Sequence, residues 1–412
     1  MKSDRWQSLP LKRVVESVQS GTSINGTPWP ADGNQPGVLK TSSVYGGVFD
    51  PTENKEVDSY DLDRVSCPVL AGSLIVSRMN TKQHLGVAAA IRQDFPNLYL
   101  PDRLWAVTFC GAEPRFIDWW TKTPAYRSQV EAVSVGTSSS MQNISQGDFL
   151  ELRIELPDFE TQHAIADYLD RETARIDTLI EEQQHLIEML RERRSAVISS
   201  ALAPNDSWVR RRIKHIGETS LGKMLDAGRA VRDGDQPRPY VRAADVRADG
   251  SVNLADLNEM PFSGVEMEAF DLRAGDVLLI EGGATVGRPG FMFESAPGIA
   301  FQKTVNRLRV GSQADARFVY WSMLCLYESS YYANHYGSVS FVHLTGEKLR
   351  KIELRLPPLD KQRAIAVYLD VETAKIDTLI AETERFIELA RERRAALITA
   401  AVTGQIDVRE LV

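Results

Sequence analysis

The sequence lacks the features that mark secreted, zinc-binding and membrane proteins. Its three cysteines, Cys67, Cys110 and Cys325, form no Cys-x-x-Cys pair, so neither a disulfide framework nor a zinc site is indicated. No apolar run is long enough to cross a membrane, and the charged start at Met1–Trp6 has no apolar stretch behind it that would make a secretory signal. We therefore expect a cytoplasmic protein in a reducing environment.

Motifs of common enzymes are also missing. The segment Gly282–Arg288 has the glycines of a phosphate loop but not its lysine, so it is expected to form a tight turn. The sequence contains no H-E-x-x-H, no G-x-S-x-G and no Asn-Pro-Pro-Tyr/Phe motif, and its six histidines are scattered. These absences favour a binding protein over an enzyme, so we expect no catalytic residues, bound metal or cofactor in this chain.

The composition is that of a globular protein with several domains. The 412 residues are 43% hydrophobic and 25% charged, which excludes collagen-like and wholly disordered chains. At roughly 100–200 residues per domain, this length predicts two to four domains. The net charge of −8, taken alone, argues against a nucleic-acid binder, because such proteins usually carry a basic surplus.

The chain contains a strong internal repeat. Residues 156–203 and 356–403 are identical at 27 of 48 positions without a gap. The segments between the repeats match only in their hydrophobic frame. Ala71–Val76, for example, parallels Ala274–Leu279 with different polar residues. The chain therefore alternates a variable first block (residues 1–155), a repeated segment (156–203), a variable second block (204–355) and a second repeated segment with its tail (356–412).

The repeated segments are predicted to be long helices. Pro157 and Pro357 lie where a helix can begin, Pro204 ends the first segment, and Gly404 occupies the position of a C-cap glycine in the second. A helix of about 40 residues would be about 60 Å long. Apolar residues follow a heptad-like pattern at Ile165, Leu169, Ile176, Leu179, Leu186, Leu190 and Val197, and at Ile365, Leu369, Ile376, Leu379, Phe386 and Leu397.

Two helices with the same apolar stripe can bury it against each other as a coiled coil. The alternative is two ordinary helices, each packed on its own block. Polar residues interrupt the stripe at Glu172 and Gln183, and at Glu372 and Thr383, where they either set the register or are tolerated at an edge.

Charge is divided unevenly between these parts. Residues 156–203 and 356–412 carry 13 Lys and Arg against 20 Asp and Glu, whereas the two blocks carry 35 against 36. The acidity therefore lies on the helices, and the nearly neutral blocks can still present a basic face. This weakens the objection to DNA binding.

Both blocks are predicted to be mixed α/β. The expected strands are 74–76, 86–91, 104–109 and 152–156 in the first block, and 276–280, 304–310 and 352–356 in the second. Helical patterns cover 115–132 and 315–334. Each block of about 150 residues is large enough for a core of its own.

The chain resembles the specificity subunit of type I restriction–modification enzymes over its full length. The resemblance rests on the duplicated pattern L-P-x4-Q-x-A-I-A-x-Y-L-D at 156–170 and 356–370, on I-D-T-L-I at 176–180 and 376–380, on R-E-R-R at 191–194 and 391–394, and on the tail 401–409. It implies an α+β fold, in which two target-recognition domains are separated by two long helices that form an antiparallel coiled coil with a pseudo-twofold repeat.

The resemblance also implies the function. Such a subunit reads an asymmetric, bipartite double-stranded DNA target with its two domains, and its helices act as a ruler between them. It has no catalysis of its own and docks two methylation subunits and then two restriction-translocation subunits. S-adenosylmethionine, ATP and Mg are expected in those partners and not in this chain.

Candidate DNA-binding residues are polar side chains in two polar loops of the first block and at matching places in the second, because Arg, Lys, Asn, Gln and Ser are the usual contacts to bases and phosphates. In the first block they are Arg78, Asn80, Lys82, Gln83, Ser139, Gln142 and Asn143, and in the second block Arg242, Arg288, Lys303, Ser338 and Ser340. For each of them, a solvated loop residue without a function is the alternative.

Two other functional classes stay open at this point. The chain could be a coiled-coil scaffold that presents two binding modules to other proteins, with an affinity that depends little on salt. It could also be a self-contained nuclease or methyltransferase with unrecognised motifs, in which case the purified chain alone would act on DNA.

Overall fold

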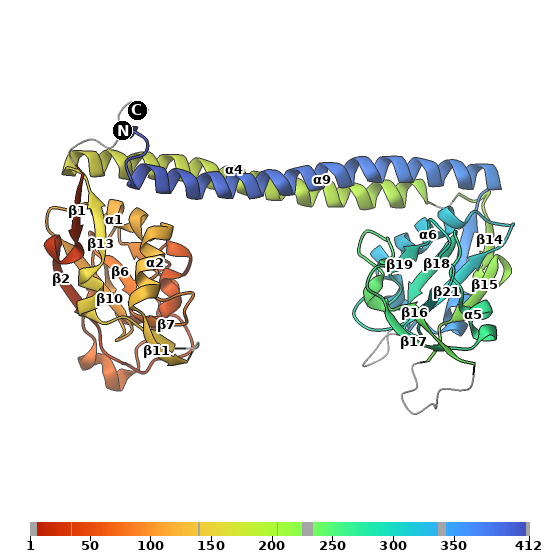
Figure 1. Ribbon diagram of the computed structural model, residues 1–412, viewed down its shortest axis with the longest axis horizontal. Helices are drawn as coiled ribbons and strands as arrows, with labels where there is room; N and C mark the ends of the chain where they lie inside the picture. Colours follow the sequence, from red (N-terminus) through yellow and green to blue (C-terminus); the bar gives the residue numbers. More distant parts are fainter. Residues whose placement is uncertain are drawn as a thin grey trace. The chain divides into compact units, whose positions relative to one another are not determined.

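The computed structural model describes residues 6–33, 35–138, 141–203, 205–224, 234–336 and 343–408. The chain divides into two compact units, residues 1–184 with 385–412, and residues 185–384. Each unit therefore combines one block with part of each long helix (Figure 1). The predicted fold class, α+β blocks with two long helices and an internal repeat, is confirmed.

The first unit holds the first block. Its strands are β1 (Gln7–Pro10), β2 (Val15–Ser20), β3 (Gly37–Leu39), β4 (Asn54–Glu56), β5 (Pro68–Val69), β6 (Leu74–Ser77), β7 (Met79–Asn80), β8 (Ala88–Ala90), β9 (Phe95–Tyr99), β10 (Leu104–Phe109), β11 (Val135–Ser138), β12 (Met141–Asn143) and β13 (Arg153–Leu156). Its helices are α1 (Pro114–Thr121), α2 (Pro124–Val133), α3 (Gln146–Glu151) and the start of α4 (Phe159–Ala201).

The second unit holds the second block. Its strands are β14 (Val209–Arg212), β15 (Gly217–Leu221), β16 (Gln236–Val241), β17 (Asn258–Phe262), β18 (Asp276–Ile280), β19 (Pro289–Phe291), β20 (Ala300–Phe301), β21 (Val305–Val310) and β22 (Glu353–Leu356). Its helices are α5 (Gly264–Phe270), α6 (Ala316–Glu328), α7 (Tyr331–Tyr336), α8 (Gly346–Lys351) and the start of α9 (Leu359–Val402).

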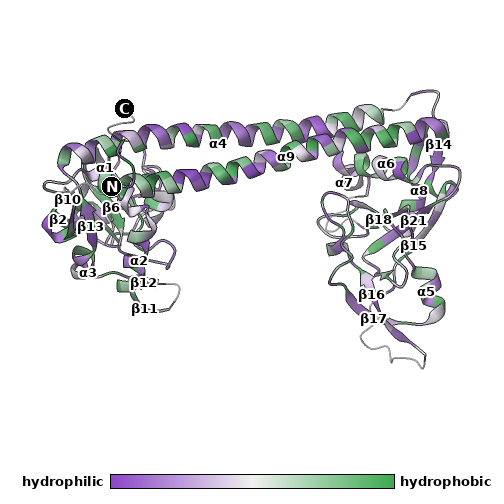
Figure 2. Cartoon of the chain, turned by 45° about the horizontal axis from the view of Figure 1, so that its top comes forward, coloured by the Kyte–Doolittle hydropathy of each residue, from purple (hydrophilic) through white to green (hydrophobic). Residues whose placement is uncertain are grey.

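The central sheets of the two blocks share one topology. The strand order is β2-β10-β6-β8 in the first block and β15-β21-β18-β19 in the second, with antiparallel neighbours throughout. The middle strands β6 and β18 are fully buried, which explains their continuous apolar sequences. Figure 2 shows hydrophobic residues in these strands and mixed colours along the long helices.

A two-stranded pair leads each block into its long helix. β1 pairs with β13 and β14 pairs with β22, both antiparallel, so the start of each block lies beside the strand that precedes α4 or α9. The tail of α9 closes the first unit with the predicted glycine cap. Gly404 has a φ of +68°, and its N–H and that of Gln405 bond back to the carbonyls of Ala401 and Ala400.

The long helices run antiparallel within each unit. In the second unit, Arg191 lies 3.3 Å from Glu384, and Arg194 lies 2.9 Å from Asp377. In the first unit, Arg394 lies 2.8 Å from Asp177. The ion pairs are Arg194 with Asp377 and Arg394 with Asp177. Arg394 is the repeat of Arg194 and Asp377 is the repeat of Asp177, each 200 residues later, so the duplication forms the same interaction twice.

The buried stripe differs in detail from the predicted one. The buried residues include, on α4, the predicted Ile165, Leu169 and Leu190 with Ala166, Thr173, Ile180 and Ile187, and, on α9, the predicted Leu369 and Ile376 with Ala366, Thr373, Thr383, Ile387 and Ala390. The expectation for Leu179, Leu379 and Phe386 was wrong, because these side chains are 36–48% exposed. The true stripe follows steps of three, four or seven residues through Thr173 and Thr373, whose hydroxyls bond to the carbonyls of Leu169 and Leu369.

A glutamine that recurs in both repeats joins each block to its helix. Gln162 accepts a hydrogen bond from the Glu113 N–H at 2.8 Å and donates to the Pro157 carbonyl, and Gln362 makes the same contacts with Asp315 and Pro357. The side chains of both glutamines are 1–2% exposed. These contacts explain why the two glutamines recur in the repeat.

An aspartate and a tryptophan form the second part of the joint. The Trp119 indole donates to Asp170 at 3.1 Å, and the Trp321 indole donates to Asp370 at 2.8 Å. Arginines complete each site, since Arg92 lies 2.7 Å from Asp170 and Arg317 lies 2.7 Å from Asp370. Each block is therefore fixed to its helix by the same kinds of polar contact, although Arg92 and Arg317 come from different parts of their blocks.

Candidate nucleic-acid interface

The structure brings the two predicted loops of the first block together. β7 and β12 pair antiparallel, so Asn80 lies opposite Gln142 and Met79 lies opposite Asn143, and β11 continues this small sheet. In the first unit, β7 and β11 lie at the end of the block away from the helices (Figure 1). Four of the predicted residues, Arg78, Asn80, Gln142 and Asn143, therefore belong to one surface region, which we call the first polar site.

Arg78 is held in a fixed direction within the first polar site. Its backbone N–H donates to the Arg103 carbonyl, and its own carbonyl accepts from Ile144. Its Nε donates to the Asp102 carbonyl at 2.7 Å, and its guanidinium lies 5.8 Å from the centroid of the Trp105 ring. Among the described residues its two Nη atoms have no hydrogen-bond partner, so they remain able to bind a ligand.

Asn80 is largely occupied by contacts within the protein. Its amide bonds with the Tyr45 hydroxyl and the Ser77 hydroxyl, and its oxygen accepts from the Thr81 N–H. The Tyr45 ring stacks on His84 at 3.8 Å. Asn80 therefore orders the loop that carries Lys82 and Gln83.

Lys82 and Gln83 are exposed on that loop. Lys82 lies 3.7 Å from Glu131 with two-thirds of its side chain exposed, so this ion pair holds it only weakly. Gln83 lines a cavity of about 260 Å³ with His84, Lys122 and Arg127. The predicted residue Ser139 lies outside the described residues.

The candidate residues of the second block differ in how far their side chains are engaged by contacts within the protein. Arg242 forms a fork with Asp245, with Nε–Oδ2 at 3.1 Å and Nη2–Oδ1 at 3.3 Å, and this hydrogen bond raises the pKa of Arg242. Arg288 lies over the Tyr327 ring and near its hydroxyl at 3.5 Å. Lys303 is exposed. The predicted residues Ser338 and Ser340 lie outside the described part of the chain.

Sequence reasoning missed the residue that matches Arg78 in the second block. Glu281 follows β18 as Arg78 follows β6, its N–H donates to the Thr304 carbonyl, and its carbonyl accepts from Leu344. Extending the match of Ala71–Val76 with Ala274–Leu279 by two residues would have paired Arg78 with Glu281. Arg288 occupies the place of Val87 instead, since Gly86 and Gly287 bond equivalently to Ser77 and Ile280.

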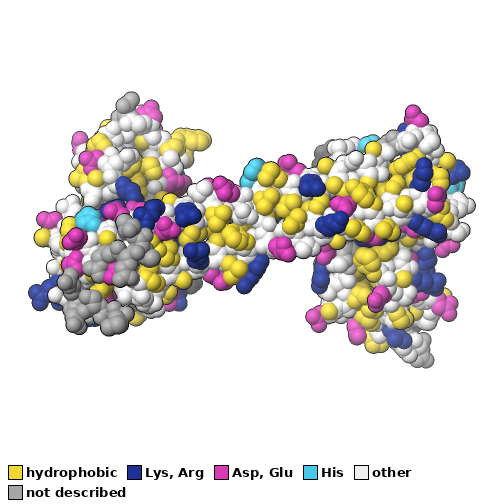
Figure 3. Space-filling view, turned by 90° about the horizontal axis from the view of Figure 1, so that it is seen from above, with side chains coloured by type: hydrophobic (Ala, Val, Ile, Leu, Met, Phe, Trp, Pro, Cys, Tyr) yellow, Lys and Arg dark blue, Asp and Glu magenta, His cyan; other side chains and the backbone are white. Residues whose placement is uncertain are grey.

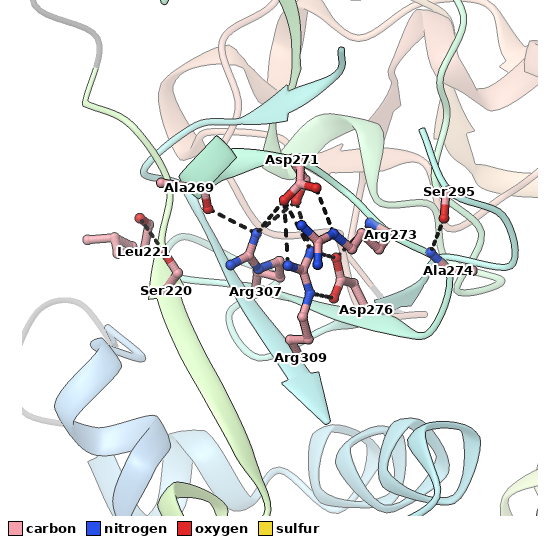
Figure 4. Close-up of polar contacts among 10 residues, drawn as sticks. All are labelled: Ser220, Leu221, Ala269, Asp271, Arg273, Ala274, Asp276, Ser295, Arg307 and Arg309. Carbon is pink, nitrogen blue, oxygen red and sulfur yellow. Dashed lines mark hydrogen bonds and ion pairs between the residues drawn. The ribbon is translucent and has the colours of Figure 1, made fainter. Parts of the chain in front are cut away.

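A network of charges lies in the second block where β18 begins, at the opposite end of that strand from Glu281 (Figure 4). Arg309 forms two bonds of 2.8 Å with the Asp276 carboxylate, and Arg307 donates to the carbonyls of Ala269 and Asp271. Burial lowers the pKa of Arg307, with the nearby Arg309 as a further cause. Because these side chains bond to one another and to backbone carbonyls, the network holds the segment 269–276 against β21. The first block has Ala106 and Thr108 at the matching strand positions.

Other kinds of site are not evident in the described ranges. Among those residues, no group of three or more His, Cys, Asp or Glu is arranged to hold a metal ion. Within the same ranges, no helix is both long and apolar enough to span a bilayer.

Comparisons with known proteins agree with the resemblance seen in the sequence. Residues 205–388 match the family model described as the type I restriction modification DNA specificity domain. The StySPI specificity subunit of a type I restriction enzyme from Salmonella potsdam is 23% identical over 98% of this chain and 90% of its own length.

Solved structures share the fold over nearly the whole chain. The HsdS subunit from Thermoanaerobacter tengcongensis superposes with a TM-score of 0.63 at 16% identity, covering 98% of both chains. A chain from a structure on complex assembly and conformational transition of the type I R-M system gives a TM-score of 0.69 at 17% identity, covering 97% of this chain and 98% of its own.

Proposed function

Because residues 205–388 match the family model of the type I restriction modification DNA specificity domain, we propose that this chain is the sequence-specific DNA-binding subunit of such a system. The observation that carries the proposal is the duplication. Two blocks share one sheet topology and one joint to the helices, whereas their exposed polar residues differ. Two similar readers with different polar residues suit a bipartite target whose two halves differ.

The first polar site supplies groups that suit base and phosphate contacts. Arg78 offers two Nη atoms that have no partner among the described residues and are the usual donors to guanine, and Gln142 on β12 lies opposite Asn80. The exposed Lys82 and Lys303 suit phosphate contacts, which position a protein on DNA without reading its sequence. The side chains of Asn80 and Arg242 are instead engaged in contacts within the protein.

The long helices offer a surface for partner subunits. Apolar side chains are visible among the charged ones along the helices (Figure 3). The exposed large apolar residues of α4 and α9 include Leu179, Met189, Leu379, Phe386 and Leu389. Since the helices are also acidic, this surface suits protein partners better than DNA. We propose that it docks two methylation subunits and then two restriction-translocation subunits. S-adenosylmethionine, ATP and Mg would be bound in those partners, catalysis would take place there, and the complex would act in the cytoplasm.

The salt dependence of binding tests the proposal. The complex of this chain with its methylation subunit should bind duplex DNA with an affinity that falls steeply as salt rises, because phosphate contacts release counterions. Lys82→Ala and Lys303→Ala should each reduce the slope of log K against log salt by about one. The control Lys351→Ala removes an exposed lysine from α8 and should leave the slope unchanged. Binding of DNA with no salt dependence would contradict the proposal and favour a protein scaffold.

A further inference from the structure

Arg78 and Glu281 occupy one position in the two blocks. Each is the first residue after the buried central strand, β6 or β18. Each donates its N–H to the carbonyl of the residue just before the neighbouring strand β10 or β21, Arg103 or Thr304. The carbonyl of each accepts a hydrogen bond from a backbone N–H further along the block, that of Ile144 or that of Leu344. The duplicated frame therefore presents a cation in the first block and a carboxylate in the second.

The Glu281 side chain is arranged to accept further hydrogen bonds. Its Oε2 lies 3.1 Å from Nδ1 of His343, which reaches across the backbone of Gly282. A Cβ at Gly282 would lie 2.8 Å from that nitrogen, so the glycine makes room for the contact. Among the described residues, a Cβ on Gly283 would meet nothing within 4 Å, so this part of the turn after Glu281 is not filled by those residues.

Both side chains keep unused capacity after their internal contacts. Arg78 is anchored through Nε, and its Nη atoms have no partner among the described residues. Glu281 is anchored through Oε2, and within the same part of the chain no partner is seen for its Oε1. A side chain that is oriented by one contact and open at its other end is suited to recognise a ligand.

The chemistry of these two ends is complementary to the two bases of one pair. In the major groove, guanine presents the acceptors O6 and N7, which pair with arginine, and cytosine presents the 4-amino donor, which pairs with a carboxylate. Resting on the proposed function, we propose that Glu281 is a specificity-determining residue that reads a cytosine in the second half of the target. Arg78 reads a guanine at the equivalent place in the first half, and His343 is a positioning residue that aims the Glu281 carboxylate.

Mapping of methylated bases tests this assignment. The chain is expressed with its methylation subunit in cells that lack other DNA methylation, and the methylated motif is compared among variants. Glu281→Gln should lose discrimination at one cytosine position of one half-target by roughly 5- to 150-fold, the range for one base contact. Arg78→Gln should change one guanine position in the other half only.

Two further variants separate recognition from folding. His343→Ala should relax the same position as Glu281→Gln, because it frees the same carboxylate, whereas a structural role would lower methylation at all sites equally. Glu294→Gln, an exposed carboxylate of the same block, should leave the motif unchanged. An unchanged motif in Glu281→Gln, or a uniform loss without a change of position, would overturn the assignment. A wild-type complex without any motif would instead overturn the proposed function.

Discussion

At the scale of single residues, buried polar side chains hold each block to its helix. Gln162 satisfies a backbone N–H and a backbone carbonyl at once, both away from water. A buried polar group that loses its partner costs about 1–3 kcal/mol. One side chain of this kind can therefore fix the junction between a block and a helix.

Replacing Gln162 tests this joint. Gln162→Ala should lower the free energy of unfolding by about 2–5 kcal/mol, because two buried backbone groups lose their partner. Chemical denaturation measures the change, and the exposed Gln184→Ala in the same helix is the matched control, with an expected change below about 0.5 kcal/mol. Equal effects of the two substitutions would show that the joint does not contribute as described.

Asp170 makes the stability of the first block depend on pH. Burial alone would raise the pKa of Asp170, but the hydrogen bond and charge of Arg92 and the Trp119 indole outweigh it and lower that pKa. The ionised carboxylate therefore stabilises the fold above its unfolded pKa of about 4, and this contribution is lost as pH falls through the lower folded pKa.

Asp170→Asn should accordingly cost about 1–3 kcal/mol at pH 7, the range for bonds to a charged group, and progressively less below pH 4. Unfolding free energies of wild type and variant across this pH range give the comparison, with the exposed Glu181→Gln as control. A difference that stays constant down to pH 3 would argue against a stabilising carboxylate.

Residue-level prediction from the sequence succeeded only in part. The loops that hold Arg78 and Gln142 could be found from their composition, and the structure places them side by side. Glu281 was overlooked because a carboxylate is repelled by phosphate and was not sought as a DNA contact. The internal partners of Asn80 and Arg242 could not be foreseen, since Tyr45 and the fork with Asp245 depend on how the loops fold back.

At the scale of elements, the long helices were the most predictable part of the chain. Their existence follows from repetition and from the absence of glycine and proline, and the cap at Gly404 forms as expected. The buried face was harder to assign, because Leu179 and Ile180 are neighbours of equal hydrophobicity. Short strands such as β3, β5 and β20 carry too few residues for a periodic pattern, so they could not be predicted.

The pair Leu179 and Ile180 gives a direct test of the buried stripe. Ile180 is 9% exposed and Leu179 is 36% exposed. Ile180→Ala should therefore cost about 2–4 kcal/mol of unfolding free energy through the cavity it leaves, and Leu179→Ala less than about 1 kcal/mol. If Leu179→Ala proved the more costly of the two, the assigned register of the helices would be wrong.

At the scale of the whole molecule, duplication explains both what repeats and what varies. The joint residues Gln162 and Gln362, and the ion-pair residues Asp177 and Asp377, are the same because both units need the same contacts. The polar residues presented by the blocks are free to differ, as Arg78 and Glu281 do. The sequence alone predicts this division, because the identity is confined to the helices.

The central claim is that the two blocks each read one half of a DNA target. The most direct test is methylated-base mapping by sequencing in cells that carry only this chain and its methylation subunit. The account predicts one methylated motif made of two unlike specific halves with an unspecified spacer of constant length. Methylation without a common motif, or a motif with a single uninterrupted specific part, would contradict it.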